Sequence, residues 1–335
     1  MIVNSESEAP SGPLFAALDL GTYKCRLVIA AYDASRRRFN VVDAFSRVVR
    51  LGNGIDVHGR LDRTSMQRAI YALDICAKKM EKYPLDGVRC VATAACRQAS
   101  NARDFTSMVR TRTGMNLEII SAEEEARFAL AGCAVHLNPN FPYIVAFDIG
   151  GGSTEVIWGH LNAARELQVI DSISLPFGVV SLAEAKRRSK NIDQFYRTTR
   201  FKVSEALNYF AQKHNIHGMI EKNLVQVIGA SGTVTTVAAF AQKLDHYDRT
   251  KVDGYILEEP AIFDVVSRMY TMDYYQFCLH PCVGPIRADL VMGGVALFQG
   301  IYDTFPVGRI TVADRGVRDG ILITLLQHYL KTQKK

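Results

Sequence analysis

Residues 18–29 read L-D-L-G-T-Y-K-C-R-L-V-I, and residues 147–158 read F-D-I-G-G-G-S-T-E-V-I-W. When the two stretches are aligned, Asp19 matches Asp148 and Gly21 matches Gly150. Each stretch is an apolar run, an Asp-x-Gly corner and a second apolar run, which is the pattern of two strands joined by a tight turn. Because each stretch opens a similar block of the chain, the pair predicts a duplicated α/β fold.

The two corners have the chemistry of a phosphate-binding loop. Glycine lacks a Cβ, so backbone N–H groups can converge on an anion. The aspartates repel phosphate, and a hydrated Mg²⁺ between carboxylate and phosphate oxygens resolves that conflict. We therefore predict Asp19 and Asp148 as metal ligands. The predicted phosphate-binding residues of the two loops are Gly21, Thr22, Lys24, Arg26, Gly150, Gly151, Gly152 and Ser153.

Length and composition predict a soluble protein of two domains. A chain of 335 residues with 48% hydrophobic and 22% charged residues can form two ordinary cores. No apolar run reaches the roughly 20 residues that span a bilayer, so no membrane association is expected. Residues 1–12 are polar and acidic without an apolar segment, so we expect a disordered leader and no secretory signal.

The seven cysteines indicate a reducing, cytoplasmic location. Their number is odd and no C-x-x-C pair occurs, so neither a disulfide framework nor a zinc site is predicted. Cys278, His280 and Cys282 resemble a metal cluster that lacks a fourth ligand, and packing thiols are the favoured interpretation.

The net charge of +6 includes several basic clusters. They are either a solvated surface or a track for an extended polyanion, and the sequence leaves both interpretations open. Aromatic interleaving and nucleic-acid motifs are absent, so DNA and RNA are not expected as partners. The clusters are Arg36–Arg38, Lys186–Arg188 with Lys190, and Arg197, Arg200 and Lys202.

The order of the expected elements is repeated along the chain. Three strands, a helix, a strand and a helix occur twice, which resembles a pair of actin-like (ribonuclease-H-type) α/β domains with mixed sheets, flanking helices and an active-site cleft between the domains. We predict domain I at residues 13–137, a hinge at His136–Pro142 and domain II at 143–316. The last helix, residues 317–331, is expected to return to domain I. Strands are predicted at 14–20, 24–32, 39–48, 88–92, 117–120, 143–149, 154–161, 164–174, 225–228 and 309–312. One helix is predicted to begin at Asn101, and another to follow the turn at 229–232 and end at about Lys243. Further helices are predicted at 63–82, 122–133, 192–214, 260–272, 287–305 and 317–330.

The turn Gly229-Ala-Ser-Gly232 precedes a predicted helix and resembles the nucleoside-side motif of the actin-like superfamily. A plain strand-to-helix turn is the alternative. As a ligand edge, Gly229, Ser231 and Gly232 would place helix N–H groups beside an anion.

Three consecutive glutamates begin the helix at 122–133. Ser121 and Glu124 have the S-x-x-E spacing of a capping box, so Glu124 has a structural role. Glu123 lies in the exposed first turn, where an acid suits the helix dipole. Glu125 shares a face with the apolar Phe128, and a carboxylate on that side needs a function or a partner.

These motifs together resemble the exopolyphosphatase / guanosine-pentaphosphate phosphohydrolase (Ppx/GppA) family. The matching segments keep the order of the family and spread over nearly the whole chain. They are A-L-D-L-G-T at 17–22, A-T-A-A-C-R-Q-A-S-N at 92–101, I-S-A-E-E-E-A-R at 120–127, F-D-I-G-G-G-S-T-E at 147–155, L-P-F-G at 175–178 and A-D-R-G-V-R-D-G at 313–320.

The resemblance implies a Mg²⁺-dependent hydrolase that removes the terminal phosphate of polyphosphate, guanosine pentaphosphate or both. It implies that Glu125 is the catalytic base and that Arg97 binds the terminal phosphoryl oxygens. It also implies catalytic roles for Asp148 and Glu155, with Glu155 as a second metal ligand or the partner of a basic side chain. Phosphoanhydride hydrolysis needs an in-line water, a base and positive charge on the transferred group, which these residues supply.

Some features depart from the family pattern. Thr22-Tyr-Lys24-Cys replaces the usual Ser-Asn-Ser, so Lys24 either adds charge beside the phosphates or points outward. Longer members carry further helical and C-terminal domains, and without these we expect weaker holding of long polymers, with Lys186–Arg188 as candidate subsites. The oligomeric state stays open, with a homodimer as one alternative. The rival functions are a kinase of the same superfamily and a non-catalytic nucleotide sensor.

Overall fold

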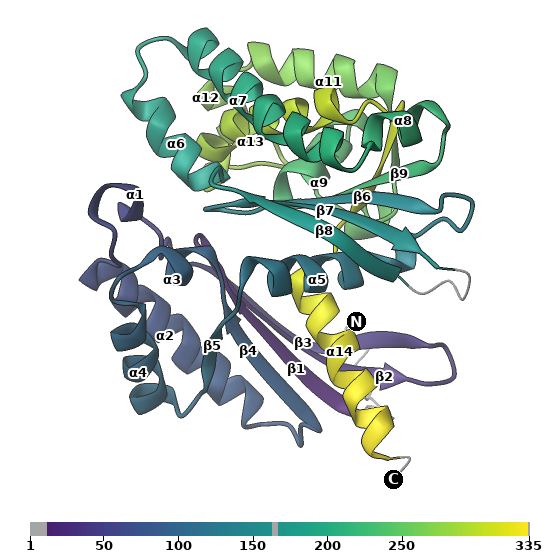
Figure 1. Ribbon diagram of the computed structural model, residues 1–335. Helices are drawn as coiled ribbons and strands as arrows, with labels where there is room; N and C mark the ends of the chain where they lie inside the picture. The colour runs from purple at the N-terminus through teal and green to yellow at the C-terminus, as the bar shows by residue number, and fades with distance from the viewer. Residues whose placement is uncertain (1–11, 163–166, 334–335) are drawn as a thin grey trace, which may run out of the picture. The chain divides into compact units, whose positions relative to one another are not determined.

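The computed structural model describes residues 12–162 and 167–333, so the predicted leader, apart from Gly12, lies outside the described residues. The chain forms two compact units. The first contains Met1–Ser121 and Arg318–Lys335, and the second contains Ala122–Val317. Each unit has one mixed sheet with flanking helices, which confirms the predicted pair of α/β domains (Figure 1).

The sheet of the first unit has the order β3-β2-β1-β4-β5. Strand β1 runs antiparallel to β2 and parallel to β4, and β4 runs parallel to β5. The strands are β1 (Leu14–Leu20), β2 (Lys24–Asp33), β3 (Arg38–Val48), β4 (Gly87–Ala92) and β5 (Leu117–Ile119).

Helices cover both faces of this sheet. Because side chains alternate along a strand, Leu14, Ala16 and Leu18 of β1 enter the core that α2 and α4 share. Phe15 lies on the other face, where its ring meets that of Tyr329 in α14 with 5.7 Å between centroids. The helices are α1 (Ile55–His58), α2 (Arg63–Met80), α3 (Ala94–Gln98), α4 (Ala102–Thr113) and α14 (Val317–Thr332).

The sheet of the second unit has the order β10-β11-β9-β6-β7-β8. Strands β6, β9 and β11 are parallel, whereas β7, β8 and β10 pair antiparallel with their neighbours. The strands are β6 (Tyr143–Ile149), β7 (Thr154–Leu161), β8 (Leu167–Leu175), β9 (Val225–Ala230), β10 (Ile256–Glu258) and β11 (Arg309–Ala313).

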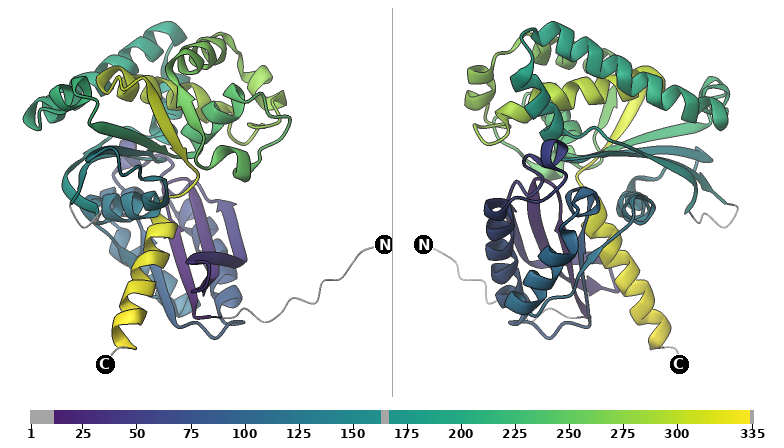
Figure 2. Two further views of the ribbon diagram at one scale, coloured as in Figure 1. Left: turned by 90° about the vertical axis from the view of Figure 1, so that its right-hand side faces the viewer. Right: turned by 60° about the vertical axis from the view of Figure 1, so that its left-hand side comes forward.

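Most helices of the second unit lie on one face of its sheet, and α5 lies on the other (Figures 1 and 2). Phe147 of β6 packs against Phe298 of α13 on the first face. Leu130 of α5 approaches Gly159 of β7 on the second face. The elements are α5 (Ala122–Gly132), a 3₁₀ turn η1 (Ala134–His136), α6 (Val179–Arg188), α7 (Ile192–Lys213), α8 (Ile216–Glu221), α9 (Gly232–Ala241), α10 (Arg249–Val252), α11 (Glu259–Thr271), α12 (Tyr274–Leu279) and α13 (Ala288–Thr304).

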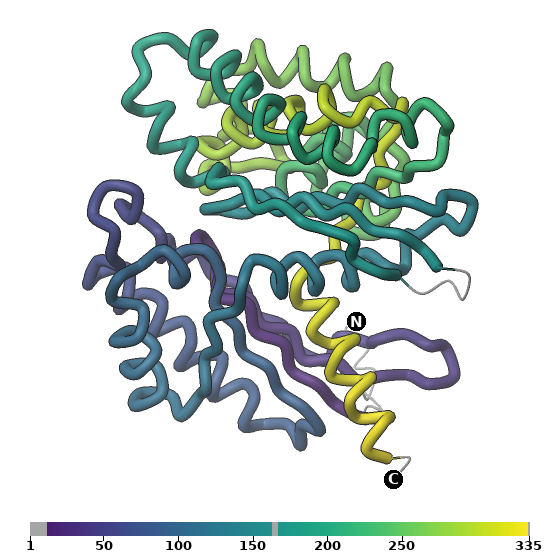
Figure 3. The backbone as a smooth tube through the Cα atoms, viewed as in Figure 1, coloured from purple at the N-terminus to yellow at the C-terminus, as the bar shows by residue number. Residues whose placement is uncertain are grey.

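The boundary between the units differs from the prediction. The sequence placed it at the proline-containing hinge His136–Pro142, but the chain divides between Ser121 and Ala122. The reason is that α5 packs on β6, β7 and β8 of the second sheet. Residues 318–335 group with the first unit, so each half of the chain ends in a helix that belongs to the other unit. Figure 3 follows the backbone from β5 into α5 and from β11 into α14.

Several short elements went unpredicted, among them α1, α3, α6, α8, α10, α12 and β10. No helix in the described part of the chain is long and apolar enough to cross a bilayer.

Candidate active site

The two Asp-x-Gly corners have the same backbone geometry. The N–H of Gly21 donates to the carbonyl oxygen of Lys24 at 2.9 Å, and the N–H of Gly150 donates to that of Ser153 at 2.9 Å. Asp19 lies opposite Arg26 in the β1–β2 register, and Asp148 lies opposite Glu155 in the β6–β7 register. We call residues 19–26 the first loop and residues 148–155 the second loop.

The first loop neutralises its own acid. The carboxylate of Asp19 is 5% exposed, and its Oδ2 lies 3.3 Å from Nη2 of Arg26. Thr22 is buried, and its carbonyl oxygen accepts a hydrogen bond from the N–H of Gly52 at 3.0 Å. Lys24 begins β2 and is half-buried, so it is not a fully solvated side chain.

The second loop presents unused N–H groups. The carbonyl oxygens of Gly150 and Gly151 accept hydrogen bonds from the N–H groups of Val179 and Val180, in the first turn of α6, at 3.0 and 2.8 Å. The carbonyls therefore face the helix. Within the described residues, the N–H groups of residues 151–153 meet no acceptor. Consecutive free N–H groups in a turn form a binding concavity for an anion.

Two carboxylates and two hydroxyls lie beside this concavity. Glu155 is 3% exposed, and its Oε1 accepts hydrogen bonds from the hydroxyls of Ser153 at 2.6 Å and Ser174 at 3.0 Å. The register places Asp148 directly across from Glu155, so two acids share one sheet face. The all-oxygen donor set of Asp148 and Glu155 fits Mg²⁺.

The same sheet face carries α5. Side chains alternate along β7, so Glu155 points to the face on which Gly159 meets Leu130 of α5. The start of α5 is acidic. Glu123 is exposed and lies 4.0 Å from Arg127, whereas Glu124 and Glu125 are both half-buried.

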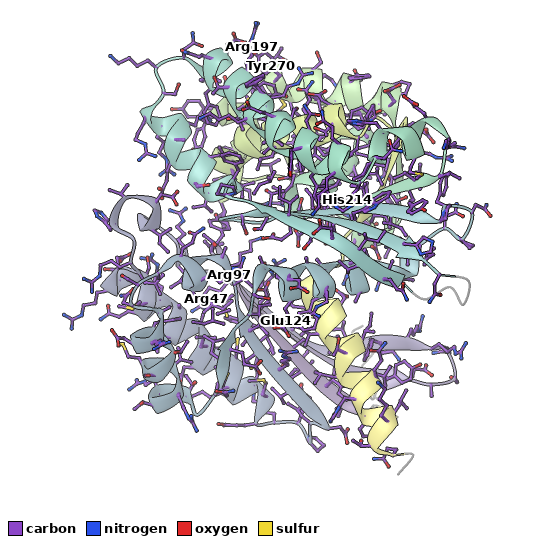
Figure 4. All side chains as sticks on the ribbon, viewed as in Figure 1. Arg47, Arg97, Glu124, Arg197, His214 and Tyr270 are labelled. Carbon is purple, nitrogen blue, oxygen red and sulfur yellow. The ribbon has the colours of Figure 1, made fainter. Side chains whose placement is uncertain are left out.

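Figure 4 labels Glu124 on α5, one position before the predicted base (Figure 4). The capping role of Glu124 and the catalytic role of Glu125 both stay predictions. Helical spacing puts Glu125 on the same face as the buried Phe128 and Gly132.

A glycine contact ties α5 to the Asp148 region. A Cβ on Gly132 would lie 2.3 Å from the carbonyl oxygen of Gly316, so the two backbones touch and only glycine fits. A Cβ on Gly316 would in turn lie 3.6 Å from Oδ2 of Asp148. The segment that follows β11 therefore lies between the helix that carries Glu125 and the acid of the second loop.

Asp253 holds that segment in place. Its carboxylate accepts hydrogen bonds from Nε2 of His136 at 2.7 Å, from Nε of Arg315 at 2.8 Å and from the N–H of Asp314 at 3.0 Å. Burial opposes ionisation, but the His136 hydrogen bond and the Arg315 charge outweigh it and lower the pKa of Asp253 to about 2. No motif of the sequence pointed to Asp253, because its partners come from distant parts of the chain.

Arg97 belongs to the first unit. It ends α3, a helix that the sequence analysis did not predict, and its Nη1 donates to the carbonyl oxygen of Ile120 at 3.2 Å. Figure 4 labels Arg97 on this unit. Its catalytic role stays a prediction.

The turn before α9 is explained by local structure. Ser231 has a φ of 146°, and its hydroxyl accepts hydrogen bonds from the N–H groups of Thr233 at 3.2 Å and Val234 at 3.1 Å. It is an N-cap. A Cβ on Gly229 would lie 2.7 Å from Cζ of Phe147, so this glycine is needed for packing. A ligand role for Gly229, Ser231 and Gly232 stays a prediction beside these structural roles.

The cysteines behave as packing residues. All seven are free, and burial raises the pKa of the Cys90 and Cys96 thiols to about 12. The ring of His280 stacks on Phe240 with 3.8 Å between centroids, and Sγ of Cys282 donates to the carbonyl oxygen of Leu244 at 3.3 Å. Across residues 12–162 and 167–333, no group of three or more His, Cys, Asp and Glu side chains is arranged to hold a metal ion.

Several members of the basic clusters are engaged in ion pairs. Arg187 pairs with Asp289 at 2.9 Å, and Arg200 pairs with Asp303. Arg197, labelled in Figure 4 near Tyr270, pairs with Asp193, which also accepts a hydrogen bond from the Tyr270 hydroxyl. These contacts reduce the positive charge available to a polyanion.

Comparison with known proteins places the chain in a family. Exopolyphosphatase 2 of Mycobacterium tuberculosis is 29% identical over 327 residues, which cover 92% of this chain and 98% of that protein. The bifunctional 3-dehydroquinate synthase/phosphatase of Fusobacterium nucleatum is 26% identical over 309 residues, which cover 90% of this chain and 45% of that protein.

Solved structures agree. A crystal structure of the Aquifex aeolicus member of the Ppx/GppA protein family has a TM-score of 0.78 and 25% identity, covering 95% of this chain and 98% of that one. An exopolyphosphatase from Cytophaga hutchinsonii, 21% identical, shares the fold with a TM-score of 0.79, covering 94% of this chain and 98% of that one. The family model described as the Ppx/GppA phosphatase family matches residues 28–329. The chain belongs to the Ppx/GppA phosphatase family.

Proposed function

We propose that this protein is a phosphohydrolase of the exopolyphosphatase type, which removes the terminal phosphate from inorganic polyphosphate, guanosine pentaphosphate or both with the aid of Mg²⁺. The observation that carries the proposal is the second loop. Its free N–H groups at residues 151–153 lie beside the acids Asp148 and Glu155, and the sheet face of those acids also carries α5.

Different residues of the second unit have different roles in the proposed reaction. The N–H groups of the second loop bind oxygens of the terminal phosphoryl group. Glu125 orients a water molecule and accepts its proton as the water oxygen attacks phosphorus. The bond from that phosphorus to the bridging oxygen breaks, and the shortened phosphate chain leaves with the bridging oxygen. In the first unit, Arg97 is the proposed ligand of the phosphoryl oxygens.

Magnesium would be held by Asp148 and Glu155, and when bound it neutralises charge on the phosphate oxygens. Asp19 remains a proposed ligand from the first loop, although its ion pair with Arg26 lowers its need for a cation. The relative from Mycobacterium tuberculosis, whose name is exopolyphosphatase 2, supports polyphosphate as the substrate.

Phosphate release from polyphosphate, guanosine pentaphosphate and ATP, each with and without Mg²⁺, tests the proposal. We expect release from at least one of the first two substrates, loss of release with EDTA, and recovery with Mg²⁺. Transfer of phosphate from ATP to an acceptor would identify a kinase instead. Binding of guanosine pentaphosphate without hydrolysis of any substrate would identify a nucleotide sensor.

A further inference from the structure

A row of three polar residues crosses the second sheet at the end where the second loop lies. Strands β6, β7 and β8 are neighbours in this sheet, and the register sets Asp148 across from Glu155 and Glu155 across from Ser174 (Figure 1). Residues that oppose one another in this way point to the same side of a sheet. Ser174 is therefore next to the two acids of the proposed metal site, and the proposed reaction gives it no role.

The carboxylate of Glu155 is held from two sides. Its Oε1 accepts a hydrogen bond from the hydroxyl of Ser153 at 2.6 Å, within the second loop, and one from the hydroxyl of Ser174 at 3.0 Å, on the neighbouring strand. A carboxylate that is 3% exposed has little access to water, so donors from the protein must replace the lost hydration. Two donors from different segments of the chain restrict the orientation of the carboxylate more than either does alone.

The two serines differ in exposure. Ser153 is 5% exposed, so its hydroxyl needs a partner within the protein for its own sake. Ser174 is exposed, so water could satisfy its hydroxyl as well as Glu155 does. The hydrogen bond from Ser174 therefore matters for Glu155 rather than for Ser174, because the carboxylate is the buried partner.

Another serine of the same strand gives a direct comparison. Ser172 lies two residues earlier on β8, and the alternation of side chains puts it on the same face as Ser174. Its register partner on β7 is the apolar Ile157, and within residues 12–162 and 167–333 its hydroxyl forms no hydrogen bond. Of these two serines, Ser174 is the one that contacts a carboxylate.

We propose that Ser174 is a positioning residue, which holds Glu155 in the orientation in which Glu155 and Asp148 together bind Mg²⁺. The metal rests on the proposed function, whereas the hydrogen bond that positions Glu155 does not. Groups that hydrogen-bond to a metal ligand orient it, and the loss of one weakens metal binding roughly 10- to 100-fold. We expect the lower end of this range, about tenfold, because Ser153 still holds Glu155 when Ser174 is changed.

The sharpest test compares Ser174→Thr with Ser174→Val. Threonine and valine side chains have nearly the same shape and both suit a strand, so the hydroxyl group is the difference between the two variants. Ser174→Thr should keep the hydrogen bond to Glu155, and Ser174→Val should lose it. Ser172→Ala is the matched control, because it removes a serine hydroxyl from the same face of the same strand.

Binding of the metal alone is measured first, with Mn²⁺ as a paramagnetic probe for a site of oxygen ligands. A titration followed by electron paramagnetic resonance, without substrate, should give wild-type affinity in Ser174→Thr and Ser172→Ala and about tenfold lower affinity in Ser174→Val. Equal affinities of the threonine and valine variants would overturn the proposal. It would also be overturned if the wild type bound no Mn²⁺, or if Asp148→Asn left Mn²⁺ binding unchanged.

Kinetics separate positioning from a general loss of structure. With tripolyphosphate, Ser174→Val should need about tenfold more Mg²⁺ for half-maximal rate than Ser174→Thr. At saturating Mg²⁺, kcat and the KM for tripolyphosphate should stay within about twofold of the wild type. A structural defect lowers kcat at every Mg²⁺ concentration, so a loss of kcat that excess Mg²⁺ does not restore would overturn the proposal.

The two measurements also distinguish this proposal from the proposed function. If no substrate is hydrolysed but Mn²⁺ binds about tenfold more weakly to Ser174→Val than to Ser174→Thr, the positioning role stands and the proposed function fails. If polyphosphate or guanosine pentaphosphate is hydrolysed and the two variants bind Mn²⁺ equally, the proposed function stands and the positioning role fails.

Discussion

The first and second loops have the same turn but opposite partners for their aspartates. Asp19 faces Arg26 across its strand pair and is neutralised at 3.3 Å, whereas Asp148 faces the acidic Glu155. The first loop therefore pairs its aspartate with a cation of the same hairpin, whereas the second loop places two acids across from each other. The comparison makes the second loop the place where we propose that Mg²⁺ binds.

The two loops are also supported differently. Next to the second loop, a Cβ on Gly178 would lie 2.3 Å from the backbone of Gly151, so the start of α6 is packed on the loop itself. Next to the first loop, a Cβ on Gly52 would lie 2.3 Å from the side-chain methyl of Thr22. Backbone packed on backbone gives the second loop less freedom to move, which suits its proposed role in binding the reacting group.

The first prediction concerns Glu125, the proposed base on α5, which packs on the sheet of the second loop. Glu125→Gln should lower kcat at least ~10²-fold with little change in KM, because the amide cannot accept a proton from water. Glu123→Gln is the matched control, since this side chain is exposed on the same turn and should keep near wild-type activity. Steady-state phosphate release decides the matter. Comparable rates for the two variants would show that Glu125 is not the catalytic base.

The second prediction exchanges the two aspartates for asparagine, one at a time. Asp148→Asn should lower activity by roughly 10²-fold and raise the Mg²⁺ concentration needed for half-maximal rate, because it removes a proposed metal ligand. Asp19→Asn should have an effect of about tenfold or less on the rate, because Arg26 already balances Asp19. Magnesium titrations of both variants are the measurement. If Asp19→Asn raised the Mg²⁺ concentration for half-maximal rate more than Asp148→Asn does, the proposed metal site would belong to the first loop instead.

Much of the fold could be predicted because its signals are local. Apolar runs, Asp-x-Gly corners and helical spacing lie within short windows of sequence, and β1, β6 and β7 have the predicted bounds. The parts that failed depend on contacts between distant residues. Helix α5 was assigned to domain I from the proline-containing hinge, but Leu130 packs against Gly159 in the second unit.

In the candidate site, too, local sequence signals could be predicted and contacts between distant residues could not. Motifs located the loops and Arg97, because their residues are adjacent in sequence. The pairing of Asp19 with Arg26 needed the strand register, and the role of Gly178 needed α6, a helix that the sequence analysis missed. The Asp253 network joins residues more than 60 positions apart, and nothing short of the tertiary structure brings these groups together.

The third prediction tests the difference in support. Gly178→Ala should cost roughly 2–3 kcal/mol of unfolding free energy, because the new methyl meets the backbone of Gly151 and one of them must shift. Gly52→Ala should cost about 1 kcal/mol, since the Thr22 methyl can rotate away. Urea unfolding gives both values, and phosphate release should suffer more in the Gly178 variant. Equal losses of unfolding free energy in the two variants would mean that the two loops adjust to an added methyl group equally well.

The last prediction concerns the support behind Asp148. Asp253 holds the segment of Gly316, which lies against Asp148, and the pKa of Asp253 is lowered to about 2 from 3.8. A lowered folded-state pKa stabilises the protein above pH 3.8, and this contribution disappears as the pH falls towards 2. Asp253→Asn should therefore lose about 2 kcal/mol at pH 7.

The pH dependence separates this charge effect from a simple packing defect. The stability difference between wild type and Asp253→Asn should shrink steadily from pH 4 to pH 2, because protonation makes the wild-type carboxyl group as neutral as the amide. Asp104→Asn, an exposed change in the first unit, serves as the control. Urea unfolding at several pH values provides the measurement. A stability difference that stays constant from pH 7 to pH 2 would show that Asp253 acts through its shape and not its charge, and the hydrogen-bonded network would then not explain how the second loop is held.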